Sequence, residues 1–187
     1  MVAGGLPGGA VAGRKDILDW LDFAASEAAG RQKILHPGTF NGNPVSAAAA
    51  ITTLRIIETT DACERANRTA ETLRRRMNEV LADKGIGWSI YGTFSGFHVF
   101  MNPEDRTIDP MTFDPLSVPW KELKTKPADA ANALRLALLL EGVDIGGWPG
   151  GLTSAAHSEA DVEATIQAFS RAIDRLKAEG MPNVSAA

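Results

Sequence analysis

The sequence of 187 residues has a single cysteine, Cys63, a single tyrosine and only short apolar runs. One cysteine cannot form an internal disulfide, which favours a reducing compartment. The apolar runs are too short to span a bilayer, and residues 1–16 lack the basic leader and sustained apolar core of a signal peptide. We therefore expect a cytoplasmic protein with no membrane partner.

Positive charge is also scarce. Nineteen Lys and Arg against 23 Asp and Glu give a net charge of -4. The short run Arg74–Arg76 lies near Glu71 and Glu79 and is typical of a solvated helix face. A nucleic-acid-binding domain needs a concentrated basic surface, so we expect no nucleic-acid partner.

Several motifs of common enzyme classes are missing. His36, His98 and His157 lie far apart, and no pair has metal-ligand spacing, so we predict no metal site. The serine of "GTFSG" is misplaced for the G-x-S-x-G elbow, which disfavours a serine hydrolase. The segment "GGLPGG" lacks both the G-x-G-x-x-G spacing and a Walker lysine, so a structural turn is favoured over a phosphate loop there.

What the sequence does have is 44% hydrophobic residues, enough for a real core. In the first part, "GAVAG" (residues 9–13) indicates a short buried strand, and residues 15–25 indicate a short helix followed by a loop. Asn43 followed by Pro44 predicts the start of a helix. A second helix is predicted from the capping-box spacing at residues 61–64, and it should end at Gly85.

The second part predicts a small α/β layer. Residues 88–102 alternate in polarity and indicate a strand pair, whereas five prolines should make residues 103–127 irregular. Residues 128–142 are apolar nearly all round and predict a buried helix. "VDI" (143–145) indicates a short strand before the loop "GGWPGG", and a cap from Ser158 to Asp161 predicts the closing helix.

The stretch "HPGTFNGNPVSAAAA", residues 36–50, combines flexible backbone with a helix start. Gly38 and Gly42 allow a ligand to approach the backbone, and Thr39 adds a hydroxyl donor. A helix N-terminus offers unpaired amides and the positive end of the helix dipole, which favour an anion. The residues indicate a phosphate or carboxylate site near Thr39, with an ordinary loop before a capped helix as the alternative.

Three blocks, in order, resemble the C-terminal part of the class III pyridoxal-phosphate aminotransferases, in the branch that contains glutamate-1-semialdehyde 2,1-aminomutase. Residues 2–18, "VAGGLPGGAVAGRKDIL", resemble the glycine-rich stretch that follows the cofactor lysine. Residues 36–51 resemble the block G-T-x-x-(G/A)-N-P, and residues 138–169 resemble the C-terminal block around S-x-A-H. The resemblance covers nearly the whole chain.

The resemblance implies the α/β architecture of fold type I: a large domain around a mostly parallel seven-stranded sheet, a smaller C-terminal α/β domain, and a homodimer. Residues 1–60 would be the end of the large cofactor-binding domain with the interdomain helix, and residues 61–187 the small C-terminal domain. Thr39 would bind the phosphate of the cofactor in the neighbouring subunit's site, with Gly38 setting the loop beside it.

The implied activity is amino-group transfer with pyridoxal 5'-phosphate on a small amino or keto substrate. In the family, the Schiff-base lysine stands just before the segment that matches the first residues here, so we expect it immediately upstream of Met1. No catalytic residue is assigned within the chain, because none of its seven lysines stands in the matching place: Lys15, Lys33, Lys84, Lys121, Lys124, Lys126 and Lys177. We therefore expect a fragment that is inactive alone.

The late loop bears on the substrate. A glutamate of the aminomutase in this loop is matched here by Pro149, which favours a related aminotransferase of unknown substrate. Trp148 is a candidate to line the substrate entrance. Packing of this tryptophan at a domain interface is an equal alternative.

Two other interpretations of the whole chain stay open. The first is a stand-alone, non-catalytic module that pairs with a full-length homologue. The second is a small anion-binding protein with no cofactor.

Overall fold

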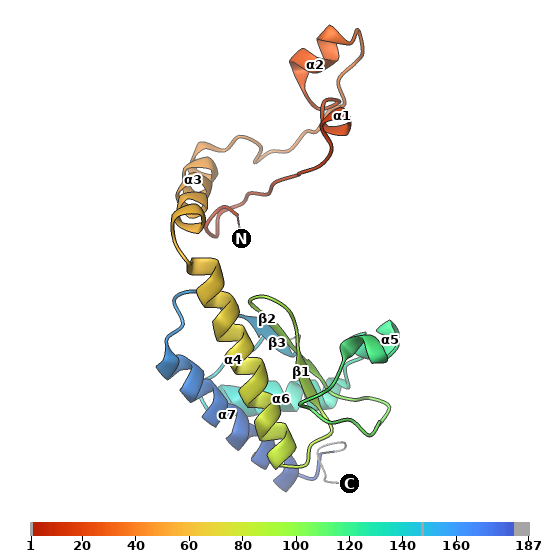
Figure 1. Cartoon of the computed structure of the whole chain (residues 1–187), viewed down its shortest axis with the longest axis vertical. Helices are drawn as coiled ribbons and strands as arrows, with labels where there is room; N and C mark the ends of the chain where they lie inside the picture. The colour runs from red at the N-terminus through yellow and green to blue at the C-terminus, as the bar shows by residue number, and fades with distance from the viewer. Residues whose placement is uncertain (1, 147, 182–187) are drawn as a thin grey trace. The chain divides into compact units, whose positions relative to one another are not determined.

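A computed structural model describes residues 2–146 and 148–181 (Figure 1). The chain divides into two compact units, Met1–Thr60 (unit 1) and Asp61–Ala187 (unit 2). That these units are the end of a large domain and a small C-terminal domain remains a prediction. No helix among the described residues is both long and apolar enough to cross a membrane.

Unit 1 contains the helices α1 (Lys15–Leu18), α2 (Phe23–Ala28) and α3 (Pro44–Thr59). The expected single helix at residues 15–25 is two helices, because Asp22 caps a new one by accepting a hydrogen bond from the amide of Ala25. The expected buried strand at residues 9–13 is wrong: this segment is irregular and exposed. A strand needs a neighbour for its backbone groups, and the described residues of unit 1 hold no strand.

Helix α3 begins where the sequence predicts. The Asn43 side chain caps it, and Pro44 occupies the first turn. Most of its surface nevertheless lies outside any packing contact, because five large apolar side chains are exposed: Val45, Ile51, Leu54, Ile56 and Ile57.

Unit 2 is an antiparallel sheet packed with three long helices. The strands β1 (Ser89–Tyr91), β2 (Gly96–Phe100) and β3 (Gly150–Leu152) lie in the order β1-β2-β3. Figure 1 shows α4 (Ala62–Asp83) beside α7 (Glu159–Ala178), and α6 (Ala128–Leu140) also contacts α7. Fully buried core side chains include Leu81, Trp88, Leu134, Phe169 and Ile173.

The long helices of unit 2 begin and end for identifiable reasons. Ser158 and Asp161 form the predicted capping box of α7. Gly85 follows α4 with a φ of +65°, a conformation that favours glycine, so the predicted end is confirmed. The predicted capping box at the start of α4 is wrong, since the Asp61 carboxylate makes no cap and pairs with arginines, Arg68 among them.

Two expectations for residues 128–152 are corrected. Helix α6 is buried on one face only, and Leu136, Leu139 and Leu140 are exposed. Residues 143–145 form no strand, and the last strand is β3, which begins inside the predicted loop. Glycine permits this pairing, because a Cβ at Gly151 would lie 2.9 Å from the Phe97 ring.

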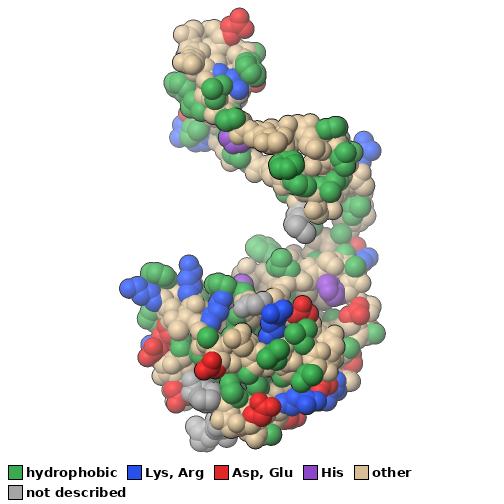
Figure 2. Space-filling view, turned by 180° about the vertical axis from the view of Figure 1, so that it is seen from behind, with side chains coloured by type: hydrophobic (Ala, Val, Ile, Leu, Met, Phe, Trp, Pro, Cys, Tyr) green, Lys and Arg blue, Asp and Glu red, His purple; other side chains and the backbone are tan. Residues whose placement is uncertain are grey.

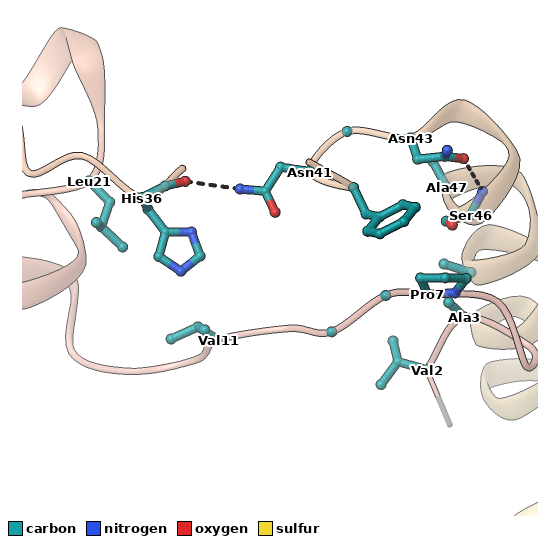
Figure 3. Close-up of a pocket in the computed structure, with 15 residues that line it drawn as sticks. Val2, Ala3, Pro7, Val11, Leu21, His36, Asn41, Asn43, Ser46 and Ala47 are labelled. Atoms are coloured by element: carbon teal, nitrogen blue, oxygen red, sulfur yellow. Dashed lines mark hydrogen bonds between the residues drawn. The ribbon is translucent and has the colours of Figure 1, made fainter. Parts of the chain in front are cut away.

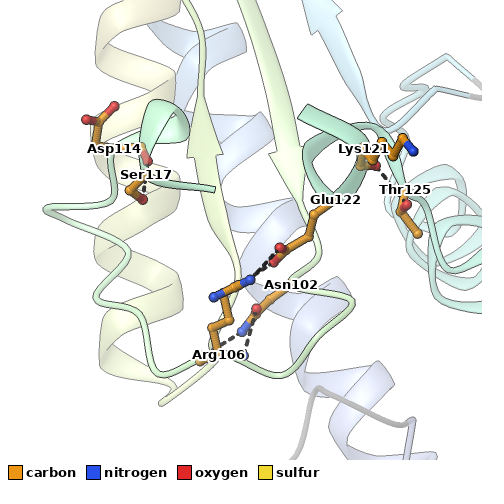
Figure 4. Close-up of polar contacts among 7 residues, drawn as sticks. All are labelled: Asn102, Arg106, Asp114, Ser117, Lys121, Glu122 and Thr125. Carbon is orange, nitrogen blue, oxygen red and sulfur yellow. Dashed lines mark hydrogen bonds and ion pairs between the residues drawn. The ribbon is translucent and has the colours of Figure 1, made fainter. Parts of the chain in front are cut away.

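The proline-rich segment 103–127 is irregular, as predicted, apart from the short helices η1 (Pro115–Ser117) and α5 (Trp120–Lys124). A bidentate ion pair fastens it: Arg106 donates to both oxygens of the buried Glu122 carboxylate at 2.7 and 2.8 Å (Figure 4). Asn102 reinforces this turn by bonding the backbone of Arg106.

The arginine run of α4 is only partly a solvated face. Arg75 pairs with Glu79 on the surface. Arg74 instead donates to the carbonyl oxygens of Phe94 and Gly96, and burial lowers its pKa. Arg74 therefore ties the β1–β2 hairpin to α4.

Candidate functional site

The loop before α3 is built from two successive turns. The amide of Asn41 donates to the Gly38 carbonyl at 3.0 Å, and the amide of Asn43 donates to the Phe40 carbonyl at 3.2 Å. Gly42 between them has a φ of +69°, which glycine adopts without strain. The backbone thus reverses twice within six residues and holds Thr39 at the outside of the first turn.

The N-terminus of α3 is less available to an anion than the sequence suggests. The Asn43 carboxamide oxygen accepts from the amides of Val45 and Ser46, both at 3.0 Å. Figure 3 shows the bond from Ser46. Pro44 has no N–H, and the amide of Ala47 bonds the Asn43 carbonyl. All the amides of the first turn are therefore occupied or missing, and any anion site must use the preceding loop.

Gly38 lies against the Asn41 side chain. A Cβ at this position would lie 2.7 Å from the side-chain oxygen of Asn41, so a larger residue would require the Asn41 side chain to shift. Asn41 in turn donates from Nδ2 to the His36 carbonyl at 2.9 Å (Figure 3). Asn41 was not singled out from the sequence, although asparagine two residues after Gly-Thr is a common turn residue.

Thr39 and its neighbours present unused donors. Thr39 is exposed, and its hydroxyl makes no hydrogen bond to any residue that the structure describes. The amides of Thr39, Phe40 and Gly42 likewise have no partner within residues 2–146 and 148–181. Residues 36–50 contain no aspartate or glutamate that would repel an anion. One hydroxyl and three amides are a suitable donor set for a phosphate group.

An open cavity of about 740 Å³ lies beside this loop in unit 1 (Figure 3). His36, Asn41 and Ser46 line it on one side, and the irregular N-terminal segment with Val2 and Val11 lines the other. Gly38 and Thr39, the two predicted phosphate-binding residues, are not among its lining residues, whereas Phe40 and Gly42 are.

The third predicted site residue, Trp148, belongs to unit 2 and is 53% exposed. The ammonium group of Lys126 lies over its indole ring. The Pro149 carbonyl accepts from the amide of Val99 at 2.9 Å and so extends the pairing of β2 with β3.

The described residues contain no group of three His, Cys, Asp or Glu side chains that could hold a metal ion. His157 stabilises a turn, because its Nδ1 accepts from the amide of Ser154 at 3.0 Å. His98 lies on the outer face of the sheet, and burial followed by the charge of Lys126 lowers its pKa. The three histidines thus lie in separate parts of the structure.

Comparison with known proteins identifies the family of this chain. The model of the family described as Aminotransferase class-III matches residues 1–106. A curated relative, glutamate-1-semialdehyde 2,1-aminomutase of Methanopyrus kandleri, is 31% identical over 94% of this chain and 37% of its own length.

Two solved structures share the fold with a TM-score of 0.75. One is a transaminase with PLP bound, 30% identical over 96% of this chain and 37% of that one. The other is an omega-transaminase from Sphaerobacter thermophilus, 25% identical over 95% of this chain and 37% of that one. The fold is therefore a portion of the fold type I transaminases, and the chain spans a little over a third of the length of these relatives.

Proposed function

The chain belongs to the class-III aminotransferase family, and on that premise we propose that it takes part in pyridoxal-phosphate-dependent amino-group transfer between small amino and keto compounds. When bound, pyridoxal phosphate supplies the electron sink for such a reaction. The chain's own share is to position the cofactor and to shape the substrate side.

In this proposal the loop at residues 38–42 holds the phosphate group. The observation that carries it is the set of exposed, unbonded donors: the hydroxyl and amide of Thr39 and the amides of Phe40 and Gly42. Gly38 and Asn41 fix the turn that presents them. These donors bind and orient the phosphate, and so set the position of the ring to which it is attached.

We further propose that the loop acts across a homodimer interface, in the site of the other protomer. The exposed apolar surface of α3, directly after the loop, supports this, because Ile51 and Leu54 would be removed from water by a partner. In the same proposal Trp148 belongs to the substrate side. Pro149, in place of the glutamate expected for an aminomutase, favours a transaminase.

The Schiff-base lysine is, in our proposal, none of the seven lysines of this chain. We therefore expect the purified 187-residue chain to show no turnover with pyridoxal phosphate and paired amino and keto substrates. Measurable turnover that follows the chain through purification would contradict this part of the proposal.

The phosphate assignment is tested by titrating the ¹⁵N-labelled chain with pyridoxine 5'-phosphate, whose lack of an aldehyde prevents reaction with surface lysines. We expect the amide resonances of Thr39, Phe40 and Gly42 to shift, and pyridoxine without phosphate to leave them unchanged. Thr39→Val removes the hydroxyl at nearly constant volume and should weaken binding about tenfold, the value of one charge-assisted hydrogen bond.

The matched control is Thr52→Val. The Thr52 hydroxyl donates to the Ala48 carbonyl within α3 and is exposed, so this variant should bind as the parent does. If the loop resonances fail to move, move equally with pyridoxine, or move equally in Thr39→Val, the loop does not hold the phosphate and the proposal fails.

A further inference from the structure

The positively charged side chains of unit 2 fall into two groups. Every arginine of this unit bonds a carboxylate or a backbone carbonyl: Arg65, Arg68, Arg74, Arg75, Arg76, Arg106, Arg135, Arg171 and Arg175. Lys84 and Lys177 are bonded as well. The ammonium groups of Lys121, Lys124 and Lys126, all within six residues, make no hydrogen bond or ion pair with any described residue and lie near aromatic rings instead.

The carboxylate nearest in sequence to Lys121 and Lys124 is already engaged. Glu122 is buried and bonded by Arg106, and Figure 4 shows the Lys121 ammonium pointing away from it. Lys121 and Lys124 lie 5.8 and 5.5 Å from the centre of the Trp120 ring, whereas Lys126 lies over Trp148. Figure 2 shows basic side chains gathered with apolar ones at this end of the unit. The three lysines therefore form a cationic surface with aromatic neighbours.

Lys126 differs from the other two lysines because further donors stand near it. His98 and Tyr91 are paired across β1 and β2, so their side chains share one face of the sheet, and their rings are 5.4 Å apart. Phe97 and Val99, which alternate with His98, point into the core, so this shared face is the outer one. The charge of Lys126 acts on His98, second only to burial in lowering its pKa.

The space beside His98 is kept open by glycine. Gly150 pairs with His98 in β3, and a Cβ there would lie 3.2 Å from the imidazole Nδ1. Trp148 stands two residues before Gly150 on the extended pairing, with its indole half exposed. Burial raises the pKa of Tyr91, which keeps its phenol protonated as a donor.

The donors on this face have no acceptor. The Tyr91 hydroxyl, the His98 imidazole and the Lys126 ammonium make no hydrogen bond to any residue that the structure describes. Burial also lowers the pKa of Lys126. A single anionic group would satisfy all three donors.

We propose that Lys126, His98 and Tyr91 form a carboxylate-recognition site on the outer face of the sheet, with Trp148 receiving the apolar or aryl body of the bound acid. The ligand class is an amino or keto acid. That this acid is a substrate rests on the proposed function. The binding itself can be tested without the cofactor, because the site lies wholly within unit 2.

The test is a titration of the complete chain with 3-phenylpropionate, a carboxylic acid that no lysine attacks, and with 3-phenylpropionamide, its neutral analogue. We expect the carboxylate to shift the indole N–H resonance of Trp148, assigned with Trp148→Phe, and the amide to leave it unchanged. Bound carboxylate should also raise the pKa of His98 in an NMR titration, because a negative charge favours the imidazolium.

Lys126→Met keeps most of the aliphatic stem and removes the charge, and it should weaken binding at least about tenfold. Lys121→Met and Lys124→Met remove equally unpaired charges at Trp120 and should bind as the parent does. The proposal is overturned if the carboxylate does not bind, if the amide binds equally well, or if all three lysine variants lose affinity alike. These results are independent of the pyridoxine phosphate titration at Thr39, so either proposal can fail alone.

Discussion

Unit 1 and unit 2 differ in how their elements are held. Unit 2 buries a continuous apolar core between the sheet and the helices α4, α6 and α7, with Phe169 and Ile173 fully enclosed. Among the described residues of unit 1, Ala3 is the one apolar side chain that is buried, and α3 exposes most of its apolar surface. Caps and turns shape unit 1 locally, whereas tertiary packing shapes unit 2. The comparison teaches that the loop at residues 38–42 has its geometry without a core beneath it.

Hydrogen exchange should give the largest difference between the two units. Amides in the middle of α7, such as those of Phe169 and Ile173, should exchange only through global unfolding, at a cost of about 5 kcal/mol or more. Amides of α3 should exchange with a protection near that of a fraying helix. Mass spectrometry of peptides from both helices would measure this, and equal protection along the chain would remove the distinction.

Replacing isoleucine by alanine should lower the free energy of unfolding by several kcal/mol more in unit 2 than in unit 1. Ile173→Ala removes a fully buried side chain from unit 2 and should lower the free energy of unfolding by about 2–5 kcal/mol. Ile56→Ala in α3 removes a side chain that is 50% exposed and should change it by less than about 0.5 kcal/mol. Urea unfolding followed by far-UV circular dichroism compares the two, and similar losses would mean that α3 is packed after all.

Within unit 2, the ion pair between Arg106 and Glu122 should contribute less to the free energy of unfolding than the core does. Arg106→Met leaves the Glu122 carboxylate buried without its bidentate partner. Because Arg106 is itself about half exposed, solvent screens part of the cost, and we expect a loss of about 1–2 kcal/mol. Arg135→Met, which breaks an exposed pair with Asp144, is the control and should change stability by under about 0.5 kcal/mol. A loss of stability no greater than that of the control would mean that the ion pair between Arg106 and Glu122 contributes little.

The smallest effect should depend on pH. Hydrogen bonds from Arg171 and then Arg175 hold the pKa of Glu141 below its ordinary value of 4.5. A lowered carboxyl pKa means that the folded state favours the ionised form, so the stabilisation is present above pH 4.5 and is lost as the pH falls through the folded-state pKa. Glu141→Gln should therefore destabilise the chain at pH 7 and become neutral in acid.

The control for the pH effect lies in unit 1. Asp16 pairs with Arg14 on the surface, and Asp16→Asn should leave the unfolding of unit 2 unchanged at every pH. Parallel urea titrations at pH 7 and pH 3 measure both variants. A Glu141→Gln effect that persists unchanged in acid would contradict the assigned cause.

Local signals in the sequence predicted the helices well. Asn43 with Pro44, Ser158 with Asp161, and Gly85 each act through bonds to nearby residues, and their helices begin or end as predicted. The alternating pattern of residues 88–102 likewise predicted the β1–β2 pair. The family resemblance gave the fold class, which the comparisons confirm.

Several of the failures share a physical origin, because they depend on a partner distant in sequence. Gly150 and Gly151 form a strand only because β2 lies alongside, and apolar composition alone favoured residues 143–145. Residues 9–13 have strand-like composition but no strand beside them. Lys126 could not be connected with His98 and Trp148 from the sequence, because they lie more than 20 residues away on either side.

The site was predicted in part. Gly38 and Thr39 do lie on one exposed turn, but the amides expected from α3 are taken by Asn43. Side-chain capping competes with ligand binding at a helix N-terminus, and the sequence cannot decide between them. Their role in binding the cofactor stays a prediction.

The most direct test is a crystal structure of the assembled protein with pyridoxal phosphate bound. Our account predicts the Thr39 hydroxyl about 2.7 Å from a phosphate oxygen, in the site of the other protomer, with the neighbouring loop amides donating to the same group. A dimer that holds the cofactor while residues 38–42 lie away from its phosphate would contradict the account.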